Sequence, residues 1–293
     1  MKRVRTGIIG LGRMGGAVAD RLLDQGVDLV VHDVAAAAVD RLTDRGAAAA
    51  TGPADVTQRS DVVLLVLPDS DAVEAAVEGP GGLLSGEVAG RLVVDLSSSR
   101  PESTRRLHGE LSRHRAALVD APVSRGVPAA RTGQLSIFVG GEPAAVDRAL
   151  PVLRELGTDI VPMGGPGTGH AAKALNNLLN ATTVLSACEV LAAARRTGLD
   201  VDAFVQAVNV SSGRSYATEV KWPRHIVPGS YDSGFSTALM AKDVAIAVEL
   251  LRGSGTATAV SAVVDQTWRA ALGRLGAARD HTQVMELVER GTW

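Results

Sequence analysis

Apolar and polar positions follow two different patterns along this chain, and the change from one to the other divides it in two. Up to residue 163, short apolar runs are separated by segments with helical spacing, which is typical of a doubly wound α/β domain. The run Val62–Leu67 is apolar throughout, as expected for a parallel strand covered on both faces. The runs predicted as strands are residues 6–10, 28–33, 62–67, 92–95, 117–120, 135–139 and 160–163.

From residue 164 onward only helical segments follow. The stretch Gly164–Gly169 contains four glycines and Pro166, which disfavours a regular element. From His170 good helix formers run on to Gly198, so we predict one long helix. It is apolar nearly all round, and we expect it to be buried as the core of a dimer interface or a seam between domains. Shorter helices are predicted over residues 201–208, 236–251, 257–272 and 282–289.

These patterns predict two domains. Residues 1–163 form an α/β domain, and residues 164–293 form an all-helical domain, which begins with the glycine hinge. The first apolar run ends in a glycine turn that opens a helix. In a dinucleotide-binding fingerprint, Gly10 forms the tight turn, Gly12 lets the backbone approach a pyrophosphate, and Gly15 lets helix and strand pack closely. The predicted cofactor contacts here are Gly10, Leu11, Gly12, Arg13, Met14 and Gly15. The alternative is a glycine-rich turn without a ligand.

Asp33 ends the second strand and favours NAD over NADP. A carboxylate at this place accepts the ribose hydroxyls of NAD and repels the 2′-phosphate of NADP. Arg41 or Arg45 could fold back onto a phosphate, which would weaken this preference. NAD is therefore the predicted cofactor, and NADP the less favoured one.

Lys173, in the first turns of the long helix, is the leading candidate for catalysis. A buried lysine is costly unless something pairs with it or uses it. Asn177 lies four residues later on the same helix face, so both side chains can point at one spot. The alternative is a lysine whose long side chain reaches the surface from the end of the helix.

Composition limits the partners of the protein. The chain has 293 residues, is 46% hydrophobic and 21% charged, and has a net charge of −2 without a basic block. We therefore expect a soluble protein with no nucleic acid or membrane partner. No signal-peptide pattern and no run of about 18 apolar residues is found, and the single Cys188 fits a reducing cytoplasm. The six histidines lack metal-ligand spacing, so no metal site is predicted.

Four motifs, in this order, resemble those of the β-hydroxyacid dehydrogenase family, which includes 3-hydroxyisobutyrate dehydrogenase and tartronate semialdehyde reductase. They are Gly10-Leu-Gly-Arg-Met-Gly15, Asp120-Ala-Pro-Val-Ser-Arg-Gly126, Gly167-Thr-Gly-His-Ala-Ala-Lys-Ala-Leu-Asn-Asn177, and Phe235 with Lys242-Asp243. The match covers essentially the whole chain. It implies a Rossmann domain, a helical C-terminal domain like that of 6-phosphogluconate dehydrogenase, a cleft between them, and a homodimer or homotetramer.

The resemblance also implies the reaction, which is hydride transfer between a nicotinamide and a short 3-hydroxy acid or its semialdehyde. It assigns Lys173 as the catalytic acid/base and Asn177 to the reacting oxygen. A lysine can do this near neutral pH only if its pKa falls from ~10.4, through burial or nearby positive charge. By the same resemblance, Ser124, Arg125, Gly126, Phe235 and Lys242 are assigned to the substrate, and Leu67, Pro68, Ser98 and again Lys242 to the cofactor.

The chain departs from the usual family motif, Asp-Ala-Pro-Val-Ser-Gly-Gly, at one residue. Arg125 stands in place of the first glycine and adds a fixed charge with five donors, so we predict that it binds an anion and selects the substrate. Related sulfolactaldehyde reductases carry an arginine there, associated with a sulfonate. Alternatively, Arg125 turns outward and pairs with a surface carboxylate. Two further alternatives are an imine reductase, which usually has Asp or Tyr at the place of Lys173, and an inactive scaffold, which would have lost that lysine.

Overall fold

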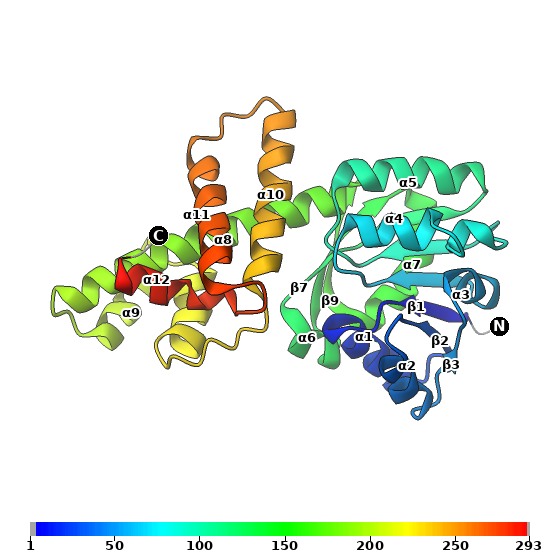
Figure 1. The fold of residues 1–293 in the computed structure, drawn as a ribbon, viewed down its shortest axis with the longest axis horizontal. Coiled ribbons are helices and arrows are strands. Elements are labelled where there is room, and N and C mark those ends of the chain that lie inside the picture. The colour runs from blue at the N-terminus through cyan, green and yellow to red at the C-terminus, as the bar shows by residue number, and fades with distance from the viewer. Residues whose placement is uncertain (1–3, 292–293) are drawn as a thin grey trace. The chain divides into compact units, whose positions relative to one another are not determined.

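The structure is a computed structural model that describes residues 4–291, and the chain divides after Lys173 into two compact units (Figure 1). The first unit contains the sheet and the start of the longest helix. Its elements are β1 (Thr6–Ile9), α1 (Arg13–Asp24), β2 (Leu29–His32), α2 (Ala36–Thr43), β3 (Ala48–Ala49), α3 (Pro53–Arg59), β4 (Val62–Leu65), α4 (Ser70–Glu78), η1 (Leu83–Ser85), β5 (Leu92–Asp95), α5 (Pro101–Arg113), β6 (Ala117–Asp120), β7 (Val123–Ser124), α6 (Gly126–Thr132), β8 (Leu135–Gly141), α7 (Pro143–Leu156), β9 (Gly157–Gly164) and the first turns of α8 (Thr168–Arg196).

The strands form one sheet in the order β3-β2-β1-β4-β5-β6-β8-β7, with β9 paired to β8. Strands β3 to β6 along this order are parallel, with β1 between β2 and β4. This is the strand order of a doubly wound Rossmann domain, in which ligands bind beyond the carboxyl ends of the strands. The predicted α/β Rossmann fold is therefore confirmed.

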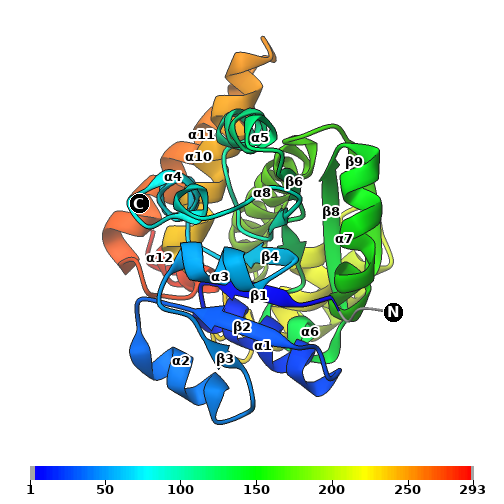
Figure 2. The ribbon, with the colours of Figure 1, turned by 90° about the vertical axis from the view of Figure 1, so that its right-hand side faces the viewer.

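Helices cover both faces of this sheet (Figure 2). Ile8 and Leu64 point into a core shared with α1, α2, α6 and α7, whereas the neighbouring residues Ile9 and Val63 point into a core shared with α3, α4 and α5. Successive residues of a strand face opposite sides, so both sides must be apolar. The uninterrupted apolar runs in the sequence follow from this arrangement.

Some local boundaries differ from the sequence prediction. Strand β4 ends at Leu65 rather than Leu67, because the backbone N–H of Leu67 turns away to the hydroxyl of Ser97, at 2.9 Å. Strands β3 and β7 were not predicted, since two residues are too few to show an alternating pattern.

The regular elements in the described part of the second unit are all helices, joined by loops and one isolated β-bridge between Ser236 and Asp280. The unit comprises the rest of α8, α9 (Val201–Asn209), the π-helix η2 (Ala217–Ile226), α10 (Thr237–Gly253), α11 (Ala259–Leu275), η3 (His281–Gln283) and α12 (Val284–Arg290). Its core packs around the buried rings of Trp222 and Trp268. The predicted helical domain is confirmed, except that η2 was not predicted because Pro223 interrupts its helical pattern. The domain boundary that the sequence predicts between residues 163 and 164 stays a prediction.

Helix α8 is continuous over 29 residues. It is long and apolar enough to cross a membrane by length and composition, but 56% of that stretch is buried inside the protein, as in the core helix of a soluble protein. In the single chain Leu179 is 69% and Val190 is 47% exposed, so burial of α8 as the core of a dimer interface or a seam between domains stays a prediction.

Candidate active site

The glycine turn between β1 and α1 places its three glycines in different steric environments. Gly10 has a φ of +94°, and a Cβ there would overlap the carbonyl oxygen of Val66. A Cβ at Gly15 would overlap the carbonyl oxygen of Gly10, so α1 packs directly on the turn. Around Gly12, by contrast, no non-neighbouring atom of the described chain lies within 4 Å of a Cβ position. The turn thus leaves open, at the N-terminus of α1, the space that the pyrophosphate of a dinucleotide requires. The other three turn residues differ in exposure, since Leu11 is buried, Met14 half-buried and Arg13 exposed.

Asp33 directly follows β2 and is hydrogen-bonded to this turn. Its Oδ2 accepts a hydrogen bond from the backbone N–H of Leu11 at 2.6 Å, and its Oδ1 accepts one from Ala35 at 2.8 Å. A carboxylate has about four lone-pair sites, so both oxygens keep capacity to accept bonds from ribose hydroxyls. The residue predicted to select the cofactor is therefore fixed to the loop that would hold the pyrophosphate.

The two arginines that could attract a 2′-phosphate face α1 instead. Arg41 binds the carboxylate of Asp20 at 2.8 Å, and Arg45 pairs with both Asp20 and Asp24. These ion pairs hold both guanidinium groups against α1. Their positions favour the preference for NAD that Asp33 predicts.

The other predicted cofactor contacts in this unit follow strands β4 and β5. The backbone N–H of Leu67 donates to Ser97 Oγ, and the N–H of Ser97 donates to Asp95 Oδ1 at 2.9 Å. Pro68 is exposed and Ser98 is half-buried. Because β1, β4 and β5 are parallel neighbours, the residues that follow them meet at one edge of the sheet. The structure therefore brings Leu67, Pro68 and Ser98 to the same edge as the glycine turn.

The loop predicted to bind the substrate carboxylate connects β7 to α6. Ser124 ends β7, and both Arg125 and Gly126 have positive φ angles, of +80° and +75°. The left-handed conformation costs a residue with a side chain roughly 1–2 kcal/mol, and such outliers cluster at functional sites. The structure thus places an arginine where the backbone favours glycine.

The guanidinium of Arg125 makes an ion pair with Asp159 at 2.6 Å and a hydrogen bond to the carbonyl oxygen of Gln134 at 3.2 Å. A hydrogen bond from Thr158 and the charge of Arg125 lower the pKa of Asp159. This is the outward alternative that the sequence left open. Both partners are about half exposed, and such pairs contribute little to stability, so a competing anion can displace Asp159. The role of Arg125 toward a substrate stays a prediction.

Lys173 lies at the start of α8 and is only 8% exposed. The carboxylate of Asp120, at the end of β6, accepts hydrogen bonds from the backbone N–H groups of Gly167 and His170, at 2.8 and 2.9 Å. A carboxylate at a helix N-terminus satisfies unpaired N–H groups and complements the helix dipole. The sequence motif contained Asp120 and His170, but sequence reasoning gave them no role. Asp120 anchors the turn that precedes Lys173.

Two candidate residues of the helical unit, Asn177 and Lys242, contact the same buried carboxylate, that of Asp243. The amide nitrogen of Asn177 donates to Asp243 Oδ2 at 2.5 Å, and Lys242 Nζ lies 3.2 Å from Asp243 Oδ1. An amide nitrogen carries two hydrogens, so this bond orients Asn177 and leaves a second donor. Asp243 was part of the quoted motif without a role, and it fixes both neighbours. Phe235 packs edge-on against His281, with ring centroids 5.7 Å apart.

Burial shifts the pKa of several other titratable groups in the helical unit. Burial raises the pKa of Cys188 to about 12, so its thiol stays protonated and packs in the core. Burial lowers the pKa of Lys221 to about 8, and burial together with Lys221 lowers the pKa of its partner His281 to about 3. Within residues 4–291, no group of three or more His, Cys, Asp or Glu side chains could hold a metal ion.

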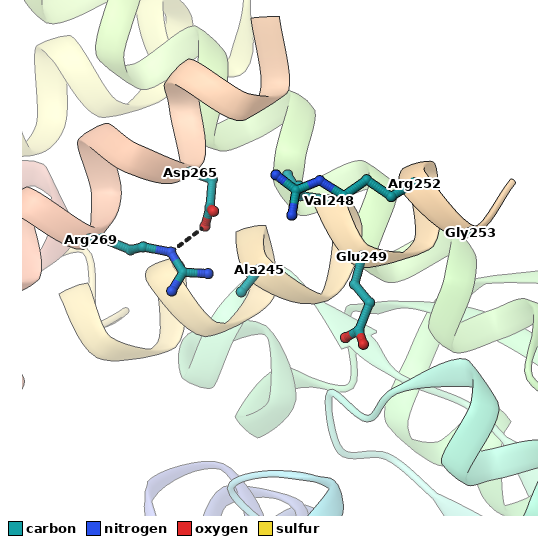
Figure 3. A pocket seen from close by; sticks show the side chains of 7 residues that line it. All are labelled: Ala245, Val248, Glu249, Arg252, Gly253, Asp265 and Arg269. Atoms are coloured by element: carbon teal, nitrogen blue, oxygen red, sulfur yellow. Dashed lines mark hydrogen bonds and ion pairs between the residues drawn. The ribbon is translucent and has the colours of Figure 1, made fainter. Parts of the chain in front are cut away.

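A hollow of about 460 Å³ lies between α10 and α11 (Figure 3). Its charged lining residues are Glu249, Arg252, Asp265 and Arg269, and the last two form an ion pair at 3.0 Å. Charges of both signs line it, and it contains none of the residues predicted to act on cofactor or substrate. We assign no activity to it.

Two protein-family models match the chain, one over each of its two parts. Residues 5–165 match the family model described as the NAD binding domain of 6-phosphogluconate dehydrogenase. Residues 167–288 match the one described as the NAD-binding of NADP-dependent 3-hydroxyisobutyrate dehydrogenase.

Several proteins with similar sequences are dehydrogenases. The chain is 38% identical to 2-(hydroxymethyl)glutarate dehydrogenase of Eubacterium barkeri, over 85% of this chain and 82% of that protein. It is 36% identical to the NAD-dependent L-serine dehydrogenase of Pseudomonas aeruginosa, over 96% of each. Among solved structures, Mycobacterium tuberculosis 3-hydroxyisobutyrate dehydrogenase with L-serine matches with a TM-score of 0.90 and 25% identity, over 97% of this chain and 99% of that one. A Streptomyces aurantiacus imine reductase is more distant, with a TM-score of 0.65 and 24% identity over 97% of this chain and 99% of its own, and shows the fold alone.

Proposed function

The chain belongs to the β-hydroxyacid dehydrogenase family, and we propose that it transfers hydride between NAD and a short 3-hydroxy acid or its semialdehyde. As a member, it is an NAD(P)-dependent oxidoreductase that acts on a CH–OH group. The observation that best supports the proposal is the first unit itself. It combines a glycine turn that is open at Gly12 with a buried Lys173 on an anchored helix start.

When bound, NAD would supply the hydride acceptor, and the side chains of the protein would transfer the proton and orient the substrate. Lys173 takes the hydroxyl proton as the carbonyl forms and returns it in the reverse direction. Asn177 donates a hydrogen bond to the same oxygen, and Asp243 holds its amide in one orientation.

Ser124 and the N–H of Gly126 bind the substrate carboxylate, with Phe235 beside the substrate. Lys242 contacts both substrate and cofactor and closes the site. Leu67, Pro68 and Ser98 contact the cofactor beside the glycine turn.

The substrate class is tested by measuring NADH formation with a panel of hydroxy acids and NADH consumption with small aldehydes and cyclic imines. The panel includes L-serine, 3-hydroxyisobutyrate and 2-(hydroxymethyl)glutarate, which relatives act on according to their names. Turnover of a hydroxy acid and its aldehyde supports the proposal. Turnover restricted to cyclic imines would replace it with imine reduction.

If the true substrate carries a second anionic group, we expect Arg125→Gly to lower its kcat/KM, because a charge-assisted hydrogen bond is lost. The expected loss of transition-state stabilisation is about 1.5–3 kcal/mol. The assay compares 3-hydroxyisobutyrate, a hydroxy-diacid and a sulfonated analogue. Glycine suits the φ of +80° at this position, so the variant should fold at least as stably as the parent.

Asp159→Asn is the matched control for Arg125. It removes the outward partner but keeps the guanidinium, so kcat/KM should stay within about threefold of the parent or rise. Equal, small losses on all three substrates in Arg125→Gly would show that the arginine is structural.

We propose that the protein is a cytoplasmic homodimer or homotetramer. The helical unit exposes large apolar side chains on α8 and α11, among them Leu179, Val190, Val260 and Val263, and such surfaces are typical of subunit interfaces. Sedimentation velocity at micromolar concentration should show a dimer or larger species. Leu179→Glu should weaken association about tenfold or more, since burying a leucine contributes about 1.5–3 kcal/mol. A parent protein that sediments as a monomer would refute this assembly.

A further inference from the structure

The ring of His170 is held inside the first unit by two hydrogen bonds. Its Nε2 lies 3.1 Å from the carbonyl oxygen of Ser97, and its Nδ1 lies 2.7 Å from the hydroxyl of Thr104. A carbonyl can only accept, so Nε2 carries a hydrogen and donates to Ser97. The hydroxyl of Thr104, which also lies 3.2 Å from the carbonyl oxygen of Arg100, bonds Nδ1. The ring is 1% exposed. These two bonds hold the imidazole in a single orientation.

The backbone of His170 is held as firmly as its ring. Asp120, itself buried, accepts bonds from the N–H groups of His170 and Gly167. A Cβ at Gly169 would overlap the carbonyl oxygens of Phe138 and Asp120, so the first turn of α8 lies directly on the sheet. This turn therefore has one defined position relative to β6 and β8.

The same contacts reach the loop after β5. Ser97, whose carbonyl holds the His170 ring, receives the N–H of Leu67 on its hydroxyl. Asp95 accepts bonds from the N–H of Ser97 and the hydroxyl of Ser99, both at 2.9 Å. Ser98 thus lies between two anchored serines. One network joins the proposed cofactor contacts Leu67 and Ser98 to the turn that carries Lys173.

We propose that His170 is a positioning residue for Lys173, fixing the first turn of α8 against the loop of Ser97–Ser99. This inference rests on the proposed function of Lys173. His170 and Lys173 are three residues apart and therefore neighbours on one helix surface, so a shift of the turn moves the base of the lysine side chain. A misplacement of about 1 Å at a reacting group can lower a rate by about 10²-fold.

The test compares His170→Phe with His170→Gln. Phenylalanine keeps an aromatic ring but makes neither hydrogen bond. The amide of glutamine carries a nitrogen that can donate to the carbonyl of Ser97 and an oxygen that can bond the hydroxyl of Thr104, so it can restore both bonds. We expect His170→Phe to lower kcat roughly 10–100-fold with KM values changed less than about threefold, and His170→Gln to recover kcat to within about threefold of the parent. Thr104→Val removes only the hydrogen bond to Nδ1, so its loss of kcat should be intermediate. This variant replaces His170→Phe in the test if the phenylalanine variant does not fold.

Two readouts separate positioning from a general structural role. In the Lys173→Ala background, His170→Phe should lower the residual rate by less than about threefold, because a positioning residue has no effect once its group is gone. Hydrogen exchange of the amides of residues 170–173 should be about tenfold faster in His170→Phe and near the parental rate in His170→Gln.

Exchange at the parental rate in His170→Phe, or an equal loss with and without Lys173, would overturn the inference. Hydrogen exchange is measured without substrate, so its result does not depend on the proposed function. If the parent enzyme oxidised no hydroxy acid, the proposed function would be contradicted, and the exchange rates would still decide whether His170 positions the turn.

Discussion

Lys173→Ala is expected to lower kcat by roughly 10²–10⁴-fold, the range for removing a general acid/base. Lys173 is almost fully buried in the first turns of α8, and removing an ammonium group from water is costly. Its assigned task is to exchange a proton with the substrate oxygen, so the affinity for NADH should stay within about threefold of the parent. Steady-state kinetics and fluorescence titration with NADH measure the two effects separately.

Lys173→Arg distinguishes proton transfer from charge alone. An arginine keeps the positive charge but does not lose its proton at accessible pH, so it cannot act as a base. Its kcat should therefore be nearly as low as that of the alanine variant. A variant of either kind with more than half the parental turnover would remove Lys173 from the mechanism.

Asp33→Asn is expected to lower the preference for NAD over NADP by roughly 10–10³-fold, expressed as the ratio of the two kcat/KM values. Like charges placed side by side in a binding site cost several kcal/mol, and the amide removes the charge that would face the 2′-phosphate. The asparagine keeps one oxygen to accept from Leu11 or Ala35 but not both bonds, so turnover with NAD should fall as well.

Asp20→Asn is the matched control for Asp33. It removes a carboxylate from the same unit that faces Arg41 and Arg45 rather than the predicted cofactor site, so the ratio should change by less than about threefold. A parent enzyme that prefers NADP, or an Asp33→Asn variant with an unchanged ratio, would show that Asp33 does not select the cofactor.

The parts of the site that sequence could predict are local. The roles of Gly10, Gly12 and Gly15 depend on a turn of six residues, and the structure gives each a steric environment that matches its expected role. The length of α8 follows from an unbroken run of helix formers. Spacing along the chain was enough in these cases because the interacting groups are near neighbours.

The parts that sequence could not predict depend on contacts between distant residues. Asp120 binds the N–H of Gly167 across 47 positions, and Asp243 binds Asn177 across 66. Arg125 finds Asp159 only because β9 lies beside β8 in the sheet. A motif indicates that such residues matter, but only the fold shows which groups they hold.

The most direct test of the proposed reaction is to follow the hydride itself. The substrate that the panel identifies is labelled with deuterium on the carbon that bears the hydroxyl, and the NADH formed is examined by mass spectrometry and NMR. We predict that deuterium appears at C4 of the nicotinamide, and that the Lys173→Ala variant transfers it to the same carbon at a rate lower by the factor lost in kcat. NADH without deuterium, or labelled NADH formed by Lys173→Ala at the parental rate, would contradict hydride transfer from a hydroxy acid with Lys173 as the base.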